Sequence, residues 1–211
     1  MKSTKSFFGL IFRYFYIKIN FNHEKIICII LSLFVFSAVN AQSIDEVLGK
    51  FDQLNDDSDK TELTTNLTSL TAAVEKEAND GEGQFKKQLL GQVGNIKNII
   101  PMVTGGTAKG GIIQKLIQTI KMLVGANRVS KMLGGGSLLG KGAGLAGNLN
   151  MMKAGASLFG EKESSGFTSL IGNIAGSTSK LDGGGMAAKA AETALKPQLG
   201  NLMGMVGKLM P

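Results

Sequence analysis

Glycine is concentrated in the second half of this chain of 211 residues. Of its 29 glycines, 23 lie at or after Gly105. A glycine inside a helix costs roughly 0.5–1 kcal/mol relative to alanine, because its backbone loses more conformational freedom on folding. We therefore expect the second half to need close packing, either against the rest of the chain or against a partner.

The first 41 residues have the three parts of a secretory signal peptide. Basic residues precede an apolar run, Ile26 to Phe36, and Val39-Asn40-Ala41 is a small-residue cleavage site. The apolar run is shorter than the ~20 residues that a membrane-spanning helix needs. The sequence predicts a cleaved signal peptide over residues 1–41 and a mature N-terminus at Gln42, with an uncleaved anchor as the alternative.

Most residue types that carry catalysis fall inside this signal. The chain has one His, one Cys and two Tyr, which are His23, Cys28, Tyr14 and Tyr16, and it has no Trp. A catalytic site after residue 41 would need a Ser or Thr beside a Lys, or a pair of carboxylates. The sequence has no catalytic motif around either arrangement. We therefore expect a protein that is not an enzyme and has no cofactor and no metal site.

Charge is segregated along the remaining chain. Residues 42–82 hold 11 acids and three lysines, a net of −8, whereas residues 83–211 hold 15 basic residues and four acids, a net of +11. The acidic segment folds back on the basic one, or both are solvated faces, or the basic part has an anionic partner such as a membrane surface. Only one arginine and four phenylalanines follow residue 41, so nucleic acid is not an expected partner.

Helical periodicity dominates residues 42–103. Ser43 and Glu46 have the spacing of a capping box at the start of a helix that runs to Leu54. A second helix is predicted from Asp59 to the turn at Asn79-Asp80-Gly81.

A third helix is predicted from Gln84 to Ile100, with Pro101 as its stop. Three amphipathic helices joined by short turns predict an acidic N-terminal helical bundle over residues 42–103.

The next helix is the most apolar one, and we expect it to begin at Gly111 or Ile112 and to end at Gly125 or Asn127. Its wide apolar face comprises Ile112, Ile113, Leu116, Ile117, Ile120 and Leu123. Lysines lie opposite this face, which is typical of a helix at a membrane surface, although an ordinary core helix has the same pattern.

Glycines spaced four residues apart are the sharpest feature of residues 104–211. The pairs are Gly140 and Gly144, Gly172 and Gly176, and Gly200 and Gly204. On a helix, such a pair leaves a stripe without side chains, so that a second helix can approach closely. In so glycine-rich a segment, chance is the competing explanation. The triplets Gly134–Gly136 and Gly183–Gly185 are expected to be flexible links.

The sequence therefore predicts an all-α protein, with an N-terminal amphipathic helical bundle followed by looser, Lys- and Gly-rich helices over residues 104–211. We expect an exported, non-catalytic protein of the periplasm, envelope or medium. It would act by helix packing, through self-association or contact with an anionic envelope surface. One alternative is a secreted membrane-active protein whose acidic segment masks its cationic part. Another is a carrier of an apolar ligand, suggested by nine methionines after residue 41.

Overall fold

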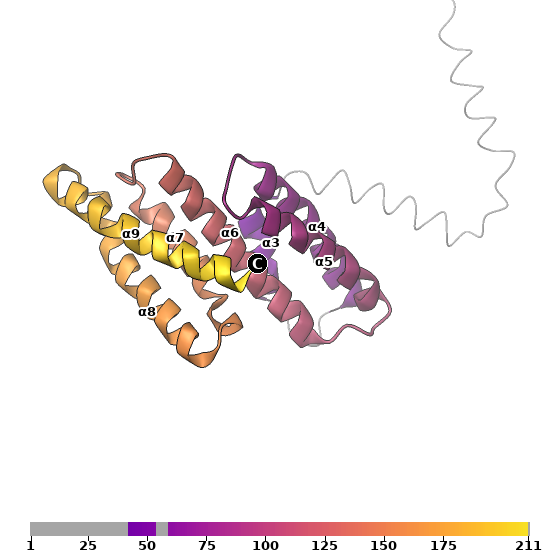
Figure 1. Ribbon diagram of the computed structural model, residues 1–211. Helices are drawn as coiled ribbons and strands as arrows, with labels where there is room; N and C mark the ends of the chain where they lie inside the picture. The colour runs from indigo at the N-terminus through magenta and orange to yellow at the C-terminus, as the bar shows by residue number, and fades with distance from the viewer. Residues whose placement is uncertain (1–41, 54–58, 211) are drawn as a thin grey trace, which may run out of the picture. The chain divides into compact units, whose positions relative to one another are not determined.

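The computed structural model describes residues 42–53 and 59–210, and within these ranges the chain is all-α (Figure 1). The predicted fold class is thus confirmed, and no strand occurs in the described part. The predicted signal peptide, residues 1–41, lies outside the described residues. The α-helices are α3 (Ile44–Phe51), α4 (Lys60–Asn79), α5 (Lys86–Thr104), α6 (Gly110–Gly134), α7 (Gly142–Lys153), α8 (Glu161–Thr178) and α9 (Gly185–Leu209), with short 3-10 turns at Ala156–Leu158 and Ser179–Leu181.

Helix α6 connects two groups of helices. It contacts α3, α4 and α5, of which α4 packs on both of the others, and it also contacts α7 and α9. Helix α8 packs against α7 and α9. Figure 1 shows α3, α4 and α5 on one side of α6 and α7, α8 and α9 on the other. Residues 42–103 and 104–211 therefore share contacts through α6.

The first two described helices begin where the sequence predicts. The Ser43 hydroxyl accepts the Glu46 N–H and the Glu46 carboxylate accepts the Ser43 N–H, each at 3.2 Å, which completes the capping box. At the start of α4, the Asp59 carboxylate accepts the N–H groups of Thr61 and Glu62. These bonds, the one from Thr61 first, hold the pKa of Asp59 below its ordinary value. Both starts depend on residues within a single turn.

Helix α5 continues one turn beyond Pro101, so the predicted stop at this residue is wrong. Proline lacks the N–H that would bond the carbonyl of Lys97, but Pro101 lies on the exposed side of α5, where water can reach the backbone. The turn still closes, because the Gly105 N–H donates to the Pro101 carbonyl at 2.9 Å.

The predicted end of α6 at Gly125 or Asn127 is also wrong, because the helix continues to Gly134. A Cβ added at Gly125 would lie 2.5 Å from the Asn148 carbonyl oxygen and 2.7 Å from the Met152 side chain. Gly125 is therefore where α7 crosses α6 at close range.

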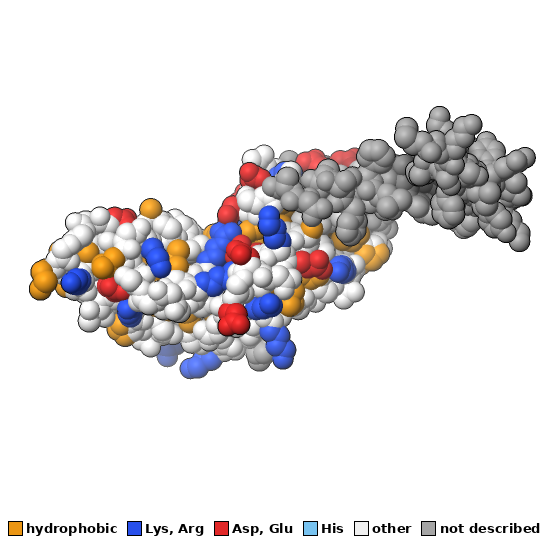
Figure 2. Space-filling view, turned by 90° about the horizontal axis from the view of Figure 1, so that it is seen from above, with side chains coloured by type: hydrophobic (Ala, Val, Ile, Leu, Met, Phe, Trp, Pro, Cys, Tyr) orange, Lys and Arg blue, Asp and Glu red, His pale blue; other side chains and the backbone are white. Residues whose placement is uncertain are grey.

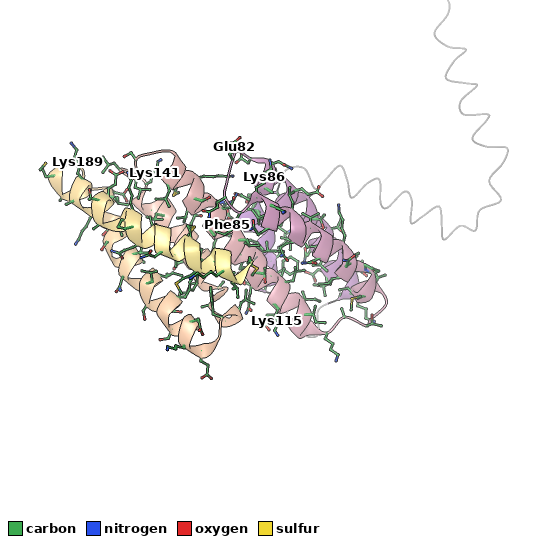
Figure 3. All side chains as sticks on the ribbon, viewed as in Figure 1. Glu82, Phe85, Lys86, Lys115, Lys141 and Lys189 are labelled. Atoms are coloured by element: carbon green, nitrogen blue, oxygen red, sulfur yellow. The ribbon has the colours of Figure 1, made fainter. Side chains whose placement is uncertain are left out.

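Asn127 is fully buried, and its side-chain oxygen accepts the Phe85 N–H at 3.3 Å just before α5 begins. Figure 3 shows Phe85 among the helices and Glu82 at the outer edge. Asn127, like Gly125, serves a tertiary contact in mid-helix and does not end α6.

The first glycine triplet is fastened to α9. The Glu192 carboxylate accepts the Leu138 N–H at 2.9 Å, and the Lys196 ammonium donates to the Gly136 carbonyl at 2.6 Å. Glu192 and Lys196 are themselves paired at 3.1 Å. The expected flexible link over Gly134–Gly136 is thus held by two charged side chains. The second triplet forms the start of α9, with Gly184 and Gly185 at positive φ.

We predict that Gly125→Ala lowers the free energy of unfolding by about 2 kcal/mol, because the new methyl overpacks the α6–α7 crossing. The matched control is Gly91→Ala on the exposed side of α5, where a Cβ would meet nothing within 4 Å. We expect the control to gain roughly 0.5–1 kcal/mol from helix propensity. Urea unfolding measures both, and a gain at Gly125 would contradict the close crossing.

Glu192 should make stability pH-dependent. The Leu138 N–H, and then Lys196, hold the pKa of Glu192 below its ordinary value of 4.5. A lowered folded-state pKa stabilises the fold above the unfolded-state pKa, and this stabilisation is lost as pH falls through the folded-state pKa. Wild type should therefore unfold at a higher temperature than Glu192→Gln near pH 7. The gap should close as pH falls below 4.5, and a gap that does not change with pH would contradict the assignment.

Candidate functional site

A charged cluster joins α6 to the two acidic helices. The Arg128 guanidinium donates to the Asp45 carboxylate at 2.9 Å and to the Glu77 carboxylate at 2.8 Å. Lys131 lies 3.7 Å from Glu77 as well. The Arg128 and Glu77 side chains are only 25% and 10% exposed, so this contact is far better shielded from water than an ordinary surface pair.

Burial alone would lower the pKa of Arg128. Hydrogen bonds and charge from Glu77 and Asp45 outweigh burial and raise the pKa of Arg128 above its ordinary value. The guanidinium therefore stays charged throughout the pH range in which the protein could fold. Because its planar fork reaches two carboxylates at once, this cluster can position α3 and α4 on α6.

Folding neutralises the charge segregation that the sequence shows. Five of the six ion pairs among the described residues join residues 42–82 to residues 83–133. Residues 83–133 hold eight basic residues and no acid, which balances the net −8 of residues 42–82. In Figure 2, acidic and basic side chains are interspersed on the visible face. The expectation that the acidic segment folds back on the basic one is confirmed.

The apolar face of α6 lies mostly in the core. Four of its six candidate residues are buried, namely Leu116, Ile117, Ile120 and Leu123. Ile113 is partly buried, whereas Ile112 is 44% exposed. The four buried side chains cannot reach a membrane surface unless the fold opens, so Ile112 is the exposed end of this face.

The three glycine pairs have different surroundings. Gly140 lies before α7 at a φ of +71°, so Gly140 and Gly144 do not share a helix. A Cβ at Gly144 would lie 3.2 Å from the end of the Met132 side chain. Gly140 therefore belongs to a turn, and Gly144 packs against another part of the same chain.

The other two pairs lie within helices and face solvent. Gly172 and Gly176 lie in α8, and Gly200 and Gly204 lie in α9, and all four are exposed. A Cβ built at any of the four meets no described atom within 4 Å. Unlike Gly125, these glycines are not required by any contact within the described fold.

The neighbours of Gly172 and Gly176 are also small and uncharged. The exposed positions of α8 from residue 165 to residue 176 are Ser165, Gly166, Ser169, Gly172, Asn173 and Gly176. Charged residues of α8 are confined to its first turn, at Glu161, Lys162 and Glu163. We call this surface the α8 glycine face. It offers the helix backbone to a partner with little side-chain cover.

A cleft of about 1220 Å³ lies where the end of α3, the start of α4, the end of α5 and the start of α6 meet. The glycine-rich segment 104–111 forms one wall, and it follows the helix α5. Lys121 in the wall is paired with Asp52. The lining residues include Phe51, Leu63, Val103, Ile113 and Ile117, together with Asp52, Lys60, Gln114, Gln118 and Lys121. This mixture differs from the mostly apolar pockets that hold apolar ligands.

The part of the chain that the structure describes has no group of three or more His, Cys, Asp or Glu side chains that could hold a metal ion. None of the helices within residues 42–53 and 59–210 combines the length and the apolar character needed to cross a membrane. Comparison of the chain with protein-family models, curated proteins and solved structures finds no match. The residues and geometry of the chain itself must therefore carry any functional proposal.

The ion cluster gives a stability prediction. Glu77→Gln should lower the free energy of unfolding by about 2 kcal/mol, because it removes a poorly hydrated partner of Arg128. The control is Glu75→Gln, which breaks the exposed pair with Lys97 and should change stability by less than about 0.5 kcal/mol. Chemical denaturation measures both. Equal effects would mean that the cluster is no more than a surface contact.

Proposed function

We propose that this chain is an exported, non-catalytic protein of the cell envelope that acts by helix packing, and that its partner is a second copy of itself. The observation that carries this proposal is the pair of open glycines in each of the helices α8 and α9. All four positions are exposed, and no described atom lies near the place of a Cβ.

These glycines have a thermodynamic cost without an internal benefit. Each lowers helix stability by roughly 0.5–1 kcal/mol relative to alanine. At Gly125 that cost is offset by the α6–α7 crossing, but at Gly172 and Gly176 the fold offers no such contact. A partner that packs directly on the helix backbone would supply the missing contact, because helices approach most closely where both lack side chains.

The α8 glycine face suits a copy of itself better than a membrane surface. A two-fold symmetric pairing sets the same patch against itself, and an uncharged patch avoids like-charge repulsion there. An interfacial membrane helix instead combines bulky apolar residues with a cationic face, and the exposed positions of α8 from residue 165 to residue 176 have neither. Self-association is therefore the form of helix packing that we favour.

The export half of the proposal is supported by the sequence alone. Basic residues, an apolar run and the Val39-Asn40-Ala41 site have the order of a signal peptide. A chain without Cys after residue 41 is also compatible with an oxidising compartment, since no thiol is left to react.

Two further functions are less well supported. A membrane-active role would require the cationic part to be released, yet α5 and α6 share ion pairs and a core with α3 and α4. A carrier role would need an apolar pocket, whereas the cleft beside segment 104–111 has many polar wall residues. We therefore place self-association ahead of both.

Self-association can be tested with substitutions on the α8 glycine face. Gly172→Gln combined with Gly176→Gln places good helix formers on α8 but covers the backbone, so we expect the variant to be monomeric where wild type is dimeric. Sedimentation velocity over a concentration series measures this, and thermal unfolding checks that the fold persists.

The matched control is Gly91→Gln combined with Gly94→Gln, which places the same side chains on the exposed side of α5, where a Cβ also meets nothing within 4 Å. We expect this control to associate like wild type. A wild-type protein that stays monomeric at all concentrations would overturn the proposal. A dimer that survives substitution of both the α8 and the α9 pairs would also overturn it.

A further inference from the structure

Gln42 occupies a particular place at the start of α3. It directly precedes Ser43, the capping residue of the helix, and its side chain is half-buried. The side-chain oxygen Oε1 accepts a hydrogen bond from the Lys50 ammonium at 3.1 Å. Under the proposed export, which this inference takes as its premise, cleavage after Ala41 would make Gln42 the first residue of the mature chain.

A new α-ammonium at Gln42 would be poorly placed. It would lie beside the N-terminal end of α3, where the helix dipole disfavours positive charge. The two acids of the first turn are already engaged, since Asp45 pairs with Arg128 and the Glu46 carboxylate accepts the Ser43 N–H. Lys50 adds a further positive charge next to the Gln42 side chain. Removal of the terminal charge would therefore favour the folded chain.

We propose that the mature chain is blocked at its N-terminus by cyclisation of Gln42 to pyroglutamate. The α-amino nitrogen attacks the side-chain carbon Cδ, so that an N–Cδ bond forms and the Cδ–Nε2 bond breaks. One amine proton passes to the departing nitrogen, which leaves as ammonia. No oxidant, reductant or second substrate enters the reaction. The product is a neutral lactam in place of an ammonium.

The surroundings of Gln42 fit this reaction. A hydrogen bond from the Lys50 ammonium draws electron density from the amide, which makes Cδ a better electrophile. The lactam keeps a carbonyl oxygen on Cδ, which can still accept a hydrogen bond. The nitrogen that is lost, Nε2, has no acceptor within the described part of the chain. The capping box survives as well, because the Ser43 N–H and hydroxyl are not involved.

Intact mass spectrometry of the protein purified from cells that export the full-length chain tests this inference. Samples are quenched at harvest, so that cyclisation during handling does not contribute. We expect one main species, lighter than the unmodified chain 42–211 by one ammonia. It should resist general aminopeptidases, and pyroglutamyl aminopeptidase should convert it to a chain that begins at Ser43. The control, Gln42→Ala, should appear at its full calculated mass and remain open to aminopeptidases.

The other outcomes separate this inference from its premise. A chain that begins at Gln42 and keeps its side-chain amide would overturn cyclisation while leaving the export proposal intact. An uncleaved chain, or one that begins elsewhere, would overturn cleavage after Ala41 and, with it, the cyclisation of Gln42. Loss of ammonia in Gln42→Ala would place the modification at another residue and would likewise reject the assignment to Gln42.

Discussion

Helix α6 can lie at the centre of the described chain only because its face toward α7 lacks a side chain at Gly125. There the Asn148 carbonyl and the Met152 side chain occupy the space that a Cβ would need. One turn further along α6, the Arg128 guanidinium reaches Asp45 and Glu77. One steric contact and one electrostatic contact thus hold α6 between α7 and the acidic helices, and the packing of the remaining helices follows from its position.

Acidic and basic residues are separated along the sequence but are paired with each other in the structure. Along the sequence, a net of −8 precedes a net of +11, which suggests a masked cationic segment. In the structure, residues 42–82 and 83–133 balance each other and exchange five ion pairs. Net positive charge is left on residues 134–211, with seven lysines and four acids. Charge segregation therefore supports the internal fold more directly than it supports an anionic partner.

The glycines separate into two groups that the sequence does not distinguish. Gly125 and Gly144 have side chains or backbone of the same chain against them, whereas Gly172, Gly176, Gly200 and Gly204 face open space. The first group is explained by internal packing. The second is destabilising in isolation, and this imbalance favours a partner outside the chain. Self-association and export remain proposals, and both concern surfaces or segments that the internal packing leaves unexplained.

The all-α class and the starts of α3 and α4 were predictable from the residues alone, because caps and a 3.6-residue period act within one or two turns. The sequence also indicated the apolar face of α6, of which Leu116 and Ile120 enter the core. Tertiary structure decided where α5 and α6 end and what each glycine does. Pro101 is tolerated because that side of α5 faces water, and Asn127 stays helical because Phe85, 42 positions earlier, supplies a donor. Partners so distant in sequence leave no local signal, so only folding could reveal them.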